Sequence, residues 1–131
     1  MKEKSNEATP QRPQGDRVLN SSLVEMDLTK FIEQIKNEPN WKNNTHNTIT
    51  IFKSDAMRVV LIALHKNALL KPHATNATIS VQVLEGSIKF ITDEKTVVLH
   101  KSQMIALQPN ITHSIEAHEE SVFLLTLSTT H

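Results

Sequence analysis

The amino-acid sequence predicts an all-β fold, a closed or nearly closed antiparallel barrel preceded by one short helix. Three observations lead to this prediction. From Thr48 onward apolar and polar residues alternate with a period of two, as they do along half-buried strands. Short β-branched runs recur between turn residues, at intervals typical of all-β sandwiches and barrels. The chain has 131 residues, which suits one domain with one core.

The barrel is expected to span about residues 45–128 and to contain eight strands. Each strand is bounded by residues that favour turns, such as Asn67, Gly86 and Asn110. The expected strands are Thr48–Lys53, Met57–His65, Thr78–Leu84, Ser87–Ile91, Thr96–Leu99, Met104–Leu107, His113–Ala117 and Ser121–Leu127.

The segment before the barrel divides into a tail and a helical part. Residues 1–20 are rich in charge, Pro and Gln and have too few apolar residues to offset the entropy of ordering, so disorder is expected there. Residues 21–131 are then the single folded domain, which begins with a possible short strand at Val24–Met26.

An amphipathic helix is expected near 28–37. Asp27 offers an N-cap, and the apolar residues that follow have the spacing i, i+3, i+4, i+7. Pro39 disfavours helical geometry at Glu38 and ends the helix, and an Asn-rich, turn-rich connector around Trp41 is expected to follow. The apolar face of the helix comprises Leu28, Phe31, Ile32 and Ile35.

Composition excludes several classes of function. The chain has no Cys, so it has neither disulfides nor thiolate chemistry, and its two Gly residues cannot build a phosphate-binding glycine loop. Fourteen Lys+Arg balance fourteen Asp+Glu, which argues against a nucleic-acid or membrane partner. With no signal-peptide core and no apolar run long enough to span a bilayer, we expect a soluble, cytoplasmic protein.

Two short stretches resemble the cupin motifs. The first cupin motif is H-x-H-x3-E-x6-G, and His73 and Gly86 match it in register. The second is G-x5-P-x-G-x2-H-x3-N, and the stretch from Ser102 to His113 resembles it, with an outright match only at the histidine. The resemblance covers about residues 48–128 and implies the RmlC-like double-stranded β-helix, or jelly roll, of a small single-domain cupin.

The departures from these motifs bear on function. The resemblance implies a divalent metal held by two His and one Glu of the first motif and the His of the second. His73 and His113 occupy two of the four ligand positions, whereas Thr75 and Ile79 replace the other His and the Glu. A zinc site usually has at least three protein ligands, so zinc, iron, nickel or copper would bind weakly or not at all. The ligand pocket implied by the resemblance is lined by His73, Thr75, Ile79, Val81, His113 and Ile115, with the two histidines converging from facing strands.

Three interpretations of His73 and His113 stay open at this point: partly buried histidines bonded to barrel hydroxyls, weak metal ligands assisted by water, or polar anchors of a metal-free ligand pocket. The leading hypothesis is a small-molecule-binding barrel without chemistry. The alternative is a metal-dependent cupin enzyme of the isomerase, dioxygenase or decarboxylase type, and a sensor or interaction protein is a third possibility. Because cupins commonly pair through N-terminal strands and edge strands expose backbone groups, a homodimer is expected.

Overall fold

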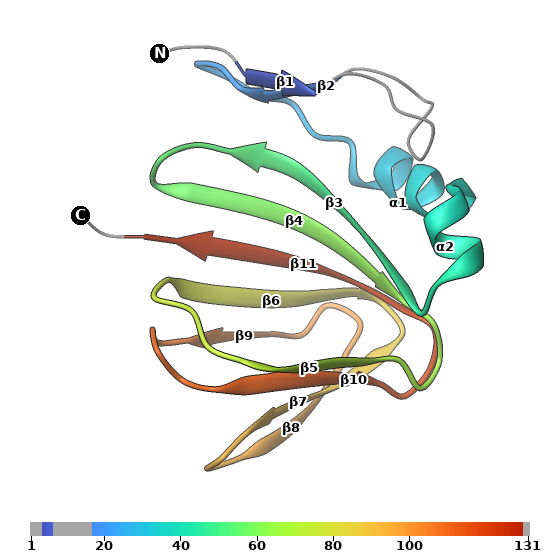
Figure 1. Cartoon of the computed structure of the whole chain (residues 1–131), viewed down its shortest axis with the longest axis vertical. Coiled ribbons are helices and arrows are strands. Elements are labelled where there is room, and N and C mark those ends of the chain that lie inside the picture. Colours follow the sequence, from blue (N-terminus) through green and yellow to red (C-terminus); the bar gives the residue numbers. More distant parts are fainter. Residues whose placement is uncertain (1–3, 7–16, 130–131) are drawn as a thin grey trace.

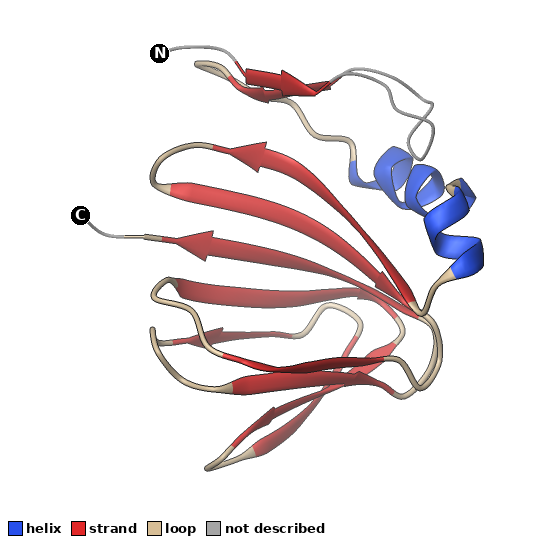
Figure 2. Ribbon diagram, in the orientation of Figure 1, coloured by secondary structure: helices blue, strands red, loops and turns tan. Residues whose placement is uncertain are grey.

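Two antiparallel sheets face each other and form a jelly-roll barrel (Figures 1 and 2). The computed structural model describes residues 4–6 and 17–129. One sheet has five strands, in the order β3 (His46–Lys53), β4 (Met57–Leu64), β11 (Ser121–Ser128), β6 (Thr78–Glu85) and β9 (Met104–Leu107). The other sheet has four strands, in the order β5 (Leu69–His73), β10 (His113–Ala117), β7 (Ser87–Thr92) and β8 (Thr96–His100).

The barrel interior is an apolar core to which both sheets contribute. Strand β6 shows how the sequence pattern produces it, because Ile79, Val81 and Val83 alternate with more exposed residues and are at most 2% exposed. Phe90 of β7, Ile115 of β10 and other buried residues complete this core. Period-two patterning therefore gives each strand one inward face, as the sequence predicted.

A second apolar cluster covers the outer face of the five-stranded sheet. Helix α1 (Leu28–Asn37) packs there through Phe31, Ile32 and the fully buried Ile35, against Ile49, Ile51, Leu61 and other residues of the sheet. The predicted helix is confirmed, and so is its cap, since Asp27 Oδ1 accepts a hydrogen bond of 3.2 Å from the Lys30 N–H.

The segment after α1 is a short helix, so the predicted turn-rich connector is wrong there. Helix α2 (Pro39–Asn43) has Pro39 in its first turn, where the missing N–H costs nothing because no partner for it would exist. Trp41 of α2 is 6% exposed and packs with α1 on the sheet. Burial of this one large ring explains why the segment is helical despite its asparagines.

The N-terminal segment also differs from the prediction. Within the range 1–20, strands β1 (Lys4–Asn6) and β2 (Arg17–Asn20) pair antiparallel, while 1–3 and 7–16 lie outside the described residues. The proposed strand at Val24–Met26 is wrong, because this segment is irregular and pairs with no described strand.

Strand β5 was missed because it contains Pro72. Proline cannot donate to a sheet ladder and argues against a central strand. β5 lies at the edge of its sheet and pairs only with β10, and a register shift in that pairing falls between His113 and Ile115. An edge position beside an irregular pairing therefore accommodates the proline.

The turns that match the cupin motifs have left-handed backbone geometry. Gly86 has φ 80°, and Ser102 and Asn110, which stand at the two glycine positions of the second motif, have φ 70° and 65°. At Gly86 an added Cβ would collide with the carbonyl oxygen of Glu120 and with Ser121 Oγ. The turn geometry is therefore kept where the glycines of the second motif are absent.

Candidate functional site

The barrel mouth is the open end formed by the turn at 54–56 and the loops 74–77 and 108–112. It lies at the end away from the helices (Figure 1). Backbone hydrogen bonds join its parts: Asn110 N donates to Thr75 O at 2.7 Å, and Thr129 N donates to Ala56 O at 2.9 Å. These hydrogen bonds connect the loops of the mouth to one another and to the C-terminal segment.

His73 and His113 meet at this mouth. They are cross-strand neighbours on β5 and β10, and their ring centroids lie 4.5 Å apart with the rings tilted by 54°. His113 is 4% exposed and stacks on Phe90 at 5.4 Å, whereas His73 is exposed. The two rings therefore approach from adjacent strands of one sheet, and the expectation that they come from facing strands is wrong.

Hydrogen bonds define which ring nitrogen of each histidine is free. His73 Nδ1 lies 3.3 Å from the carbonyl oxygen of Lys71, and His113 Nδ1 lies 2.9 Å from that of Ile111. A carbonyl oxygen only accepts, so each Nδ1 carries the proton in the neutral ring and Nε2 has the free lone pair. The same backbone arrangement orients histidines that bind metals through Nε2.

The other residues of the predicted pocket are placed differently. Ile79, Val81 and Ile115 are at most 5% exposed and belong to the apolar core below the mouth. Thr75 is half-buried in the loop between β5 and β6, where its Oγ1 accepts from Ala77 N at 3.3 Å. Positions 75 and 79, where the cupin motif has its second His and its Glu, therefore supply no imidazole or carboxylate. The described residues also contain no group of three or more His, Cys, Asp or Glu that could hold a metal.

Sequence reasoning missed one charged residue of the mouth, Arg58. Its register partners are Lys53 on β3 and Leu127 on β11, and the same ladder row continues to Ile79 on β6 and Leu107 on β9. The alternation along β4 could have indicated that Arg58 faces the barrel interior. Val60 and Ile62, two and four residues later, lie on the same face of the strand and pack in the interior.

A shallow pocket of about 250 Å³ lies beside Arg58. Thr75 lines it, so this one predicted pocket residue does border a cavity. The other lining residues are Ser54, Asp55, Ala56, Met57, Asn76, Ala77, Leu127 and Thr129. A separate pocket of about 310 Å³ is lined by Thr92, Asp93, Glu94, Leu107, Asn110, Ile111 and Thr112. The mouth therefore has two cavities, which are lined by different residues.

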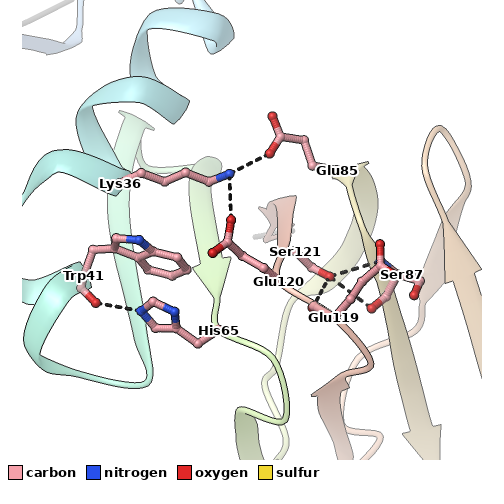
Figure 3. A network of polar contacts seen from close by, with 8 residues as sticks. All are labelled: Lys36, Trp41, His65, Glu85, Ser87, Glu119, Glu120 and Ser121. Atoms are coloured by element: carbon pink, nitrogen blue, oxygen red, sulfur yellow. Dashed lines mark hydrogen bonds and ion pairs between the residues drawn. The ribbon is translucent and has the colours of Figure 1, made fainter.

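The opposite end of the barrel holds a polar network that fastens α1 to the barrel (Figure 3). Lys36 Nζ lies 2.8 Å from a Glu85 oxygen and 3.2 Å from a Glu120 oxygen. Burial by itself lowers the pKa of Lys36, but its hydrogen bonds and charge interactions with the two carboxylates outweigh this, so that pKa lies above its ordinary value. The two carboxylates exceed the single positive charge of Lys36, and their ion pairs attach α1 to the barrel.

Beside this ion-pair group, an aromatic stack fastens α2. The rings of Trp41 and His65 stack at 3.5 Å with an interplanar angle of 16°, and His65 Nε2 donates to Trp41 O at 2.7 Å (Figure 3). The ring stack and this hydrogen bond attach α2 to the end of the barrel.

Comparison with known proteins identifies the fold. No family model matches the sequence, and no curated protein does so either. Among solved structures, a conserved protein of unknown function from Streptococcus pyogenes is 19% identical, with a TM-score of 0.68 over 86% of this chain and 92% of that one. A cupin superfamily protein from Desulfitobacterium hafniense is 13% identical, with a TM-score of 0.67 over 86% and 95%. An RmlC-like cupin from Shewanella frigidimarina is 18% identical, with a TM-score of 0.62 over 66% and 78%.

These likenesses agree with the two facing antiparallel sheets. The chain has the cupin fold, an all-β jelly roll, as the sequence motifs predicted. The described residues include no helix with the length and apolar character needed to cross a membrane.

Proposed function

We propose that this cupin-fold protein binds a small molecule at the barrel mouth, and that any divalent metal there is held only weakly. The observation that carries the proposal is the histidine pair, two imidazoles whose ring centroids lie 4.5 Å apart and whose Nδ1 atoms are both engaged by backbone carbonyls. Two oriented Nε2 atoms above an apolar core provide the polar anchors that a small-molecule site needs.

The weakness of the metal site follows from the residues around the pair. The carboxylate position of the motif is Ile79, which is 2% exposed in the core, and Thr75, at the position of the second His, offers only a hydroxyl that accepts from Ala77 N. Zinc, iron, nickel and copper all accept imidazole, but two neutral ligands without a carboxylate give a site completed by water. Exchangeable water positions are also what the alternative, a metal-dependent isomerase, dioxygenase or decarboxylase, would require.

Metal analysis of untagged protein, followed by equilibrium titration, distinguishes these functions. We expect sub-stoichiometric zinc, iron, nickel or copper after purification, and loss of the remaining binding in His73→Ala and His113→Ala. A thermal-shift screen of small metabolites should then find ligands whose effect is lost in His113→Gln. Stoichiometric, tightly held metal in the native protein would favour the enzyme, and a ligand screen without any hit would contradict the binding function.

We also propose that the protein is a cytoplasmic homodimer. Strand β3 forms an edge of the five-stranded sheet, and β2 lies alongside it. Near β2, Leu23 is 77% exposed beside a groove of about 410 Å³ lined by Val18, Ser21, Leu23, Val24, Glu25, Phe31 and Ile51. An exposed apolar side chain and a groove in one patch suit a two-fold contact with a second copy.

A further inference from the structure

Arg58 and Lys53 place two positive charges directly opposite each other at the barrel mouth. They are register partners on β4 and β3, and both side chains are exposed. Like charges at such cross-strand positions destabilise a sheet. Neither residue forms an ion pair with any residue in the described part of the chain. Within the described residues, therefore, no ion pair neutralises either positive charge, although the Asp55 carboxylate lies in the turn between them.

The pocket beside Arg58 contains groups that can hydrogen-bond an anion. Arg58, Thr75 and Asn76 line it, in a volume of about 250 Å³. Ser54 and Thr129 also line it, but their hydroxyls already donate to backbone carbonyls, at 3.3 Å and 3.2 Å. The planar fork of an arginine matches the paired oxygens of a carboxylate or phosphate. Asp55 also lines this pocket, from the turn between β3 and β4, so this rim carries two positive charges and one negative charge.

At the mouth, the described register partners whose side chains face the barrel interior include no acidic residue. On the five-stranded sheet the row is Lys53, Arg58, Leu127, Ile79 and Leu107. On the other sheet it is His73, His113 and Thr92. Asp93 and Glu94 lie in the turn after Thr92 and line the separate pocket of about 310 Å³. A cationic ligand would choose that second pocket, which makes the two charge classes separable by experiment.

From this arrangement we infer that the small molecule bound at the mouth is an anion, with a carboxylate or phosphate group held by Arg58 and supported by Lys53. The inference rests on the proposed small-molecule function and specifies its ligand class, with the anionic group in the pocket beside Arg58, which neither His73 nor His113 lines. Binding of the anion cancels the Arg58–Lys53 repulsion, so it also stabilises the ends of β3 and β4.

Amide chemical-shift titration of the ¹⁵N-labelled protein tests the inference. The probes are inorganic phosphate, succinate, glucose and ethylenediamine, each titrated separately at pH 7. We expect phosphate or succinate to shift the amide signals of residues 54–58 and 75–77 in a saturable manner. The tighter of these two anions identifies the group that Arg58 recognises.

Variants test the role of the charge. Arg58→Gln should weaken anion binding about tenfold, the usual effect of losing one charge-assisted hydrogen bond. Arg58→Lys should weaken anion binding less than Arg58→Gln does. Lys53→Gln should weaken it by an amount between those of the two Arg58 variants. The matched control is Lys66→Gln, which removes another exposed positive charge, from the turn after β4 at the other end of the barrel. It should leave anion binding unchanged.

The outcomes separate the inference from the function on which it rests. Binding at the mouth by glucose or ethylenediamine alone would overturn the anion inference while supporting a small-molecule site. Equal affinity of Arg58→Gln and the wild type for phosphate and succinate would overturn the role of Arg58. If no probe shifts any signal of the mouth, the anion inference fails, and an empty metabolite screen would overturn the proposed function as well.

Discussion

Ile79→Glu combined with Thr75→His rebuilds the four-ligand set of the cupin motif, and it should make stability depend on metal. Ile79 is 2% exposed. Glutamate keeps part of its apolar contact, so the lost burial costs about 1–2 kcal/mol. Desolvating the carboxylate by about three pKa units costs about 4 kcal/mol more. A total near 5 kcal/mol corresponds to a melting temperature lower by about 15–20 °C for a chain of this length.

Metal should recover much of this loss. Zinc at one hundred times its Kd stabilises the native state by about 2.7 kcal/mol, which is about 10 °C in melting temperature. Scanning calorimetry with and without ZnCl₂ measures both effects. The matched control is Val81→Glu with Thr75→His, because Val81 is equally buried on the same strand face but one step below the ligand position.

The result that would refute this reasoning is specific. Equal zinc rescue at positions 79 and 81 would show that neither glutamate coordinates the ion. If the native protein binds zinc as tightly as the rebuilt variant, an unidentified ligand completes the site, and the enzyme function becomes the better proposal.

Four further outcomes are expected. By urea denaturation, His113→Ala costs about 1–2 kcal/mol because its buried ring stacks on Phe90, whereas exposed His73→Ala costs less than about 0.5 kcal/mol; similar losses would contradict the ring contacts. Gly86→Ala costs more than about 2 kcal/mol by the same assay, since φ is 80° and the added Cβ meets backbone; a neutral effect would contradict the turn geometry. Because the pKa of Lys36 is raised, its ion pairs contribute up to about 1 kcal/mol below pH 10.5, and this contribution disappears as pH rises through the folded-state pKa; a Lys36→Met difference that persists at higher pH would contradict the assignment. Light scattering should give the mass of two 14.8-kDa chains, and a monomer mass at micromolar concentration would refute the dimer.

Alternation and capping account for most of what could be predicted about the fold. The strands from β6 to β11 are almost where the period-two pattern placed them, and α1 begins directly after its Asp27 cap. Two elements after α1 were not predicted. Strand β5 contains Pro72, which argues against a strand, and helix α2 contains asparagines, which favour turns, although the buried Trp41 ring stabilises it as a helix. In both places a long-range contact outweighed the local preference.

The candidate site was predicted less well than the fold. Motif positions indicated His73 and His113, and the structure places their rings side by side. Thr75 belongs to the same motif as His73, yet it lies in a loop, where a backbone hydrogen bond from Asn110 N to its carbonyl oxygen holds it at the rim. Arg58 belongs to no motif, so only its place in a ladder row could associate it with the mouth.

The sequence by itself determined which residues of each strand share a face, because side chains alternate along any strand whatever its neighbours are. It also determined where the chain turns, through Gly86 and the asparagines and serine that tolerate left-handed geometry. Only the tertiary structure decided which strands pair and in which register. Register brings Lys53 beside Arg58, and His73 beside His113, across 5 and 40 positions of sequence. The first pairing belongs to a hairpin whose turn sets the register, whereas the second depends on the packing of the whole barrel, which no local pattern encodes.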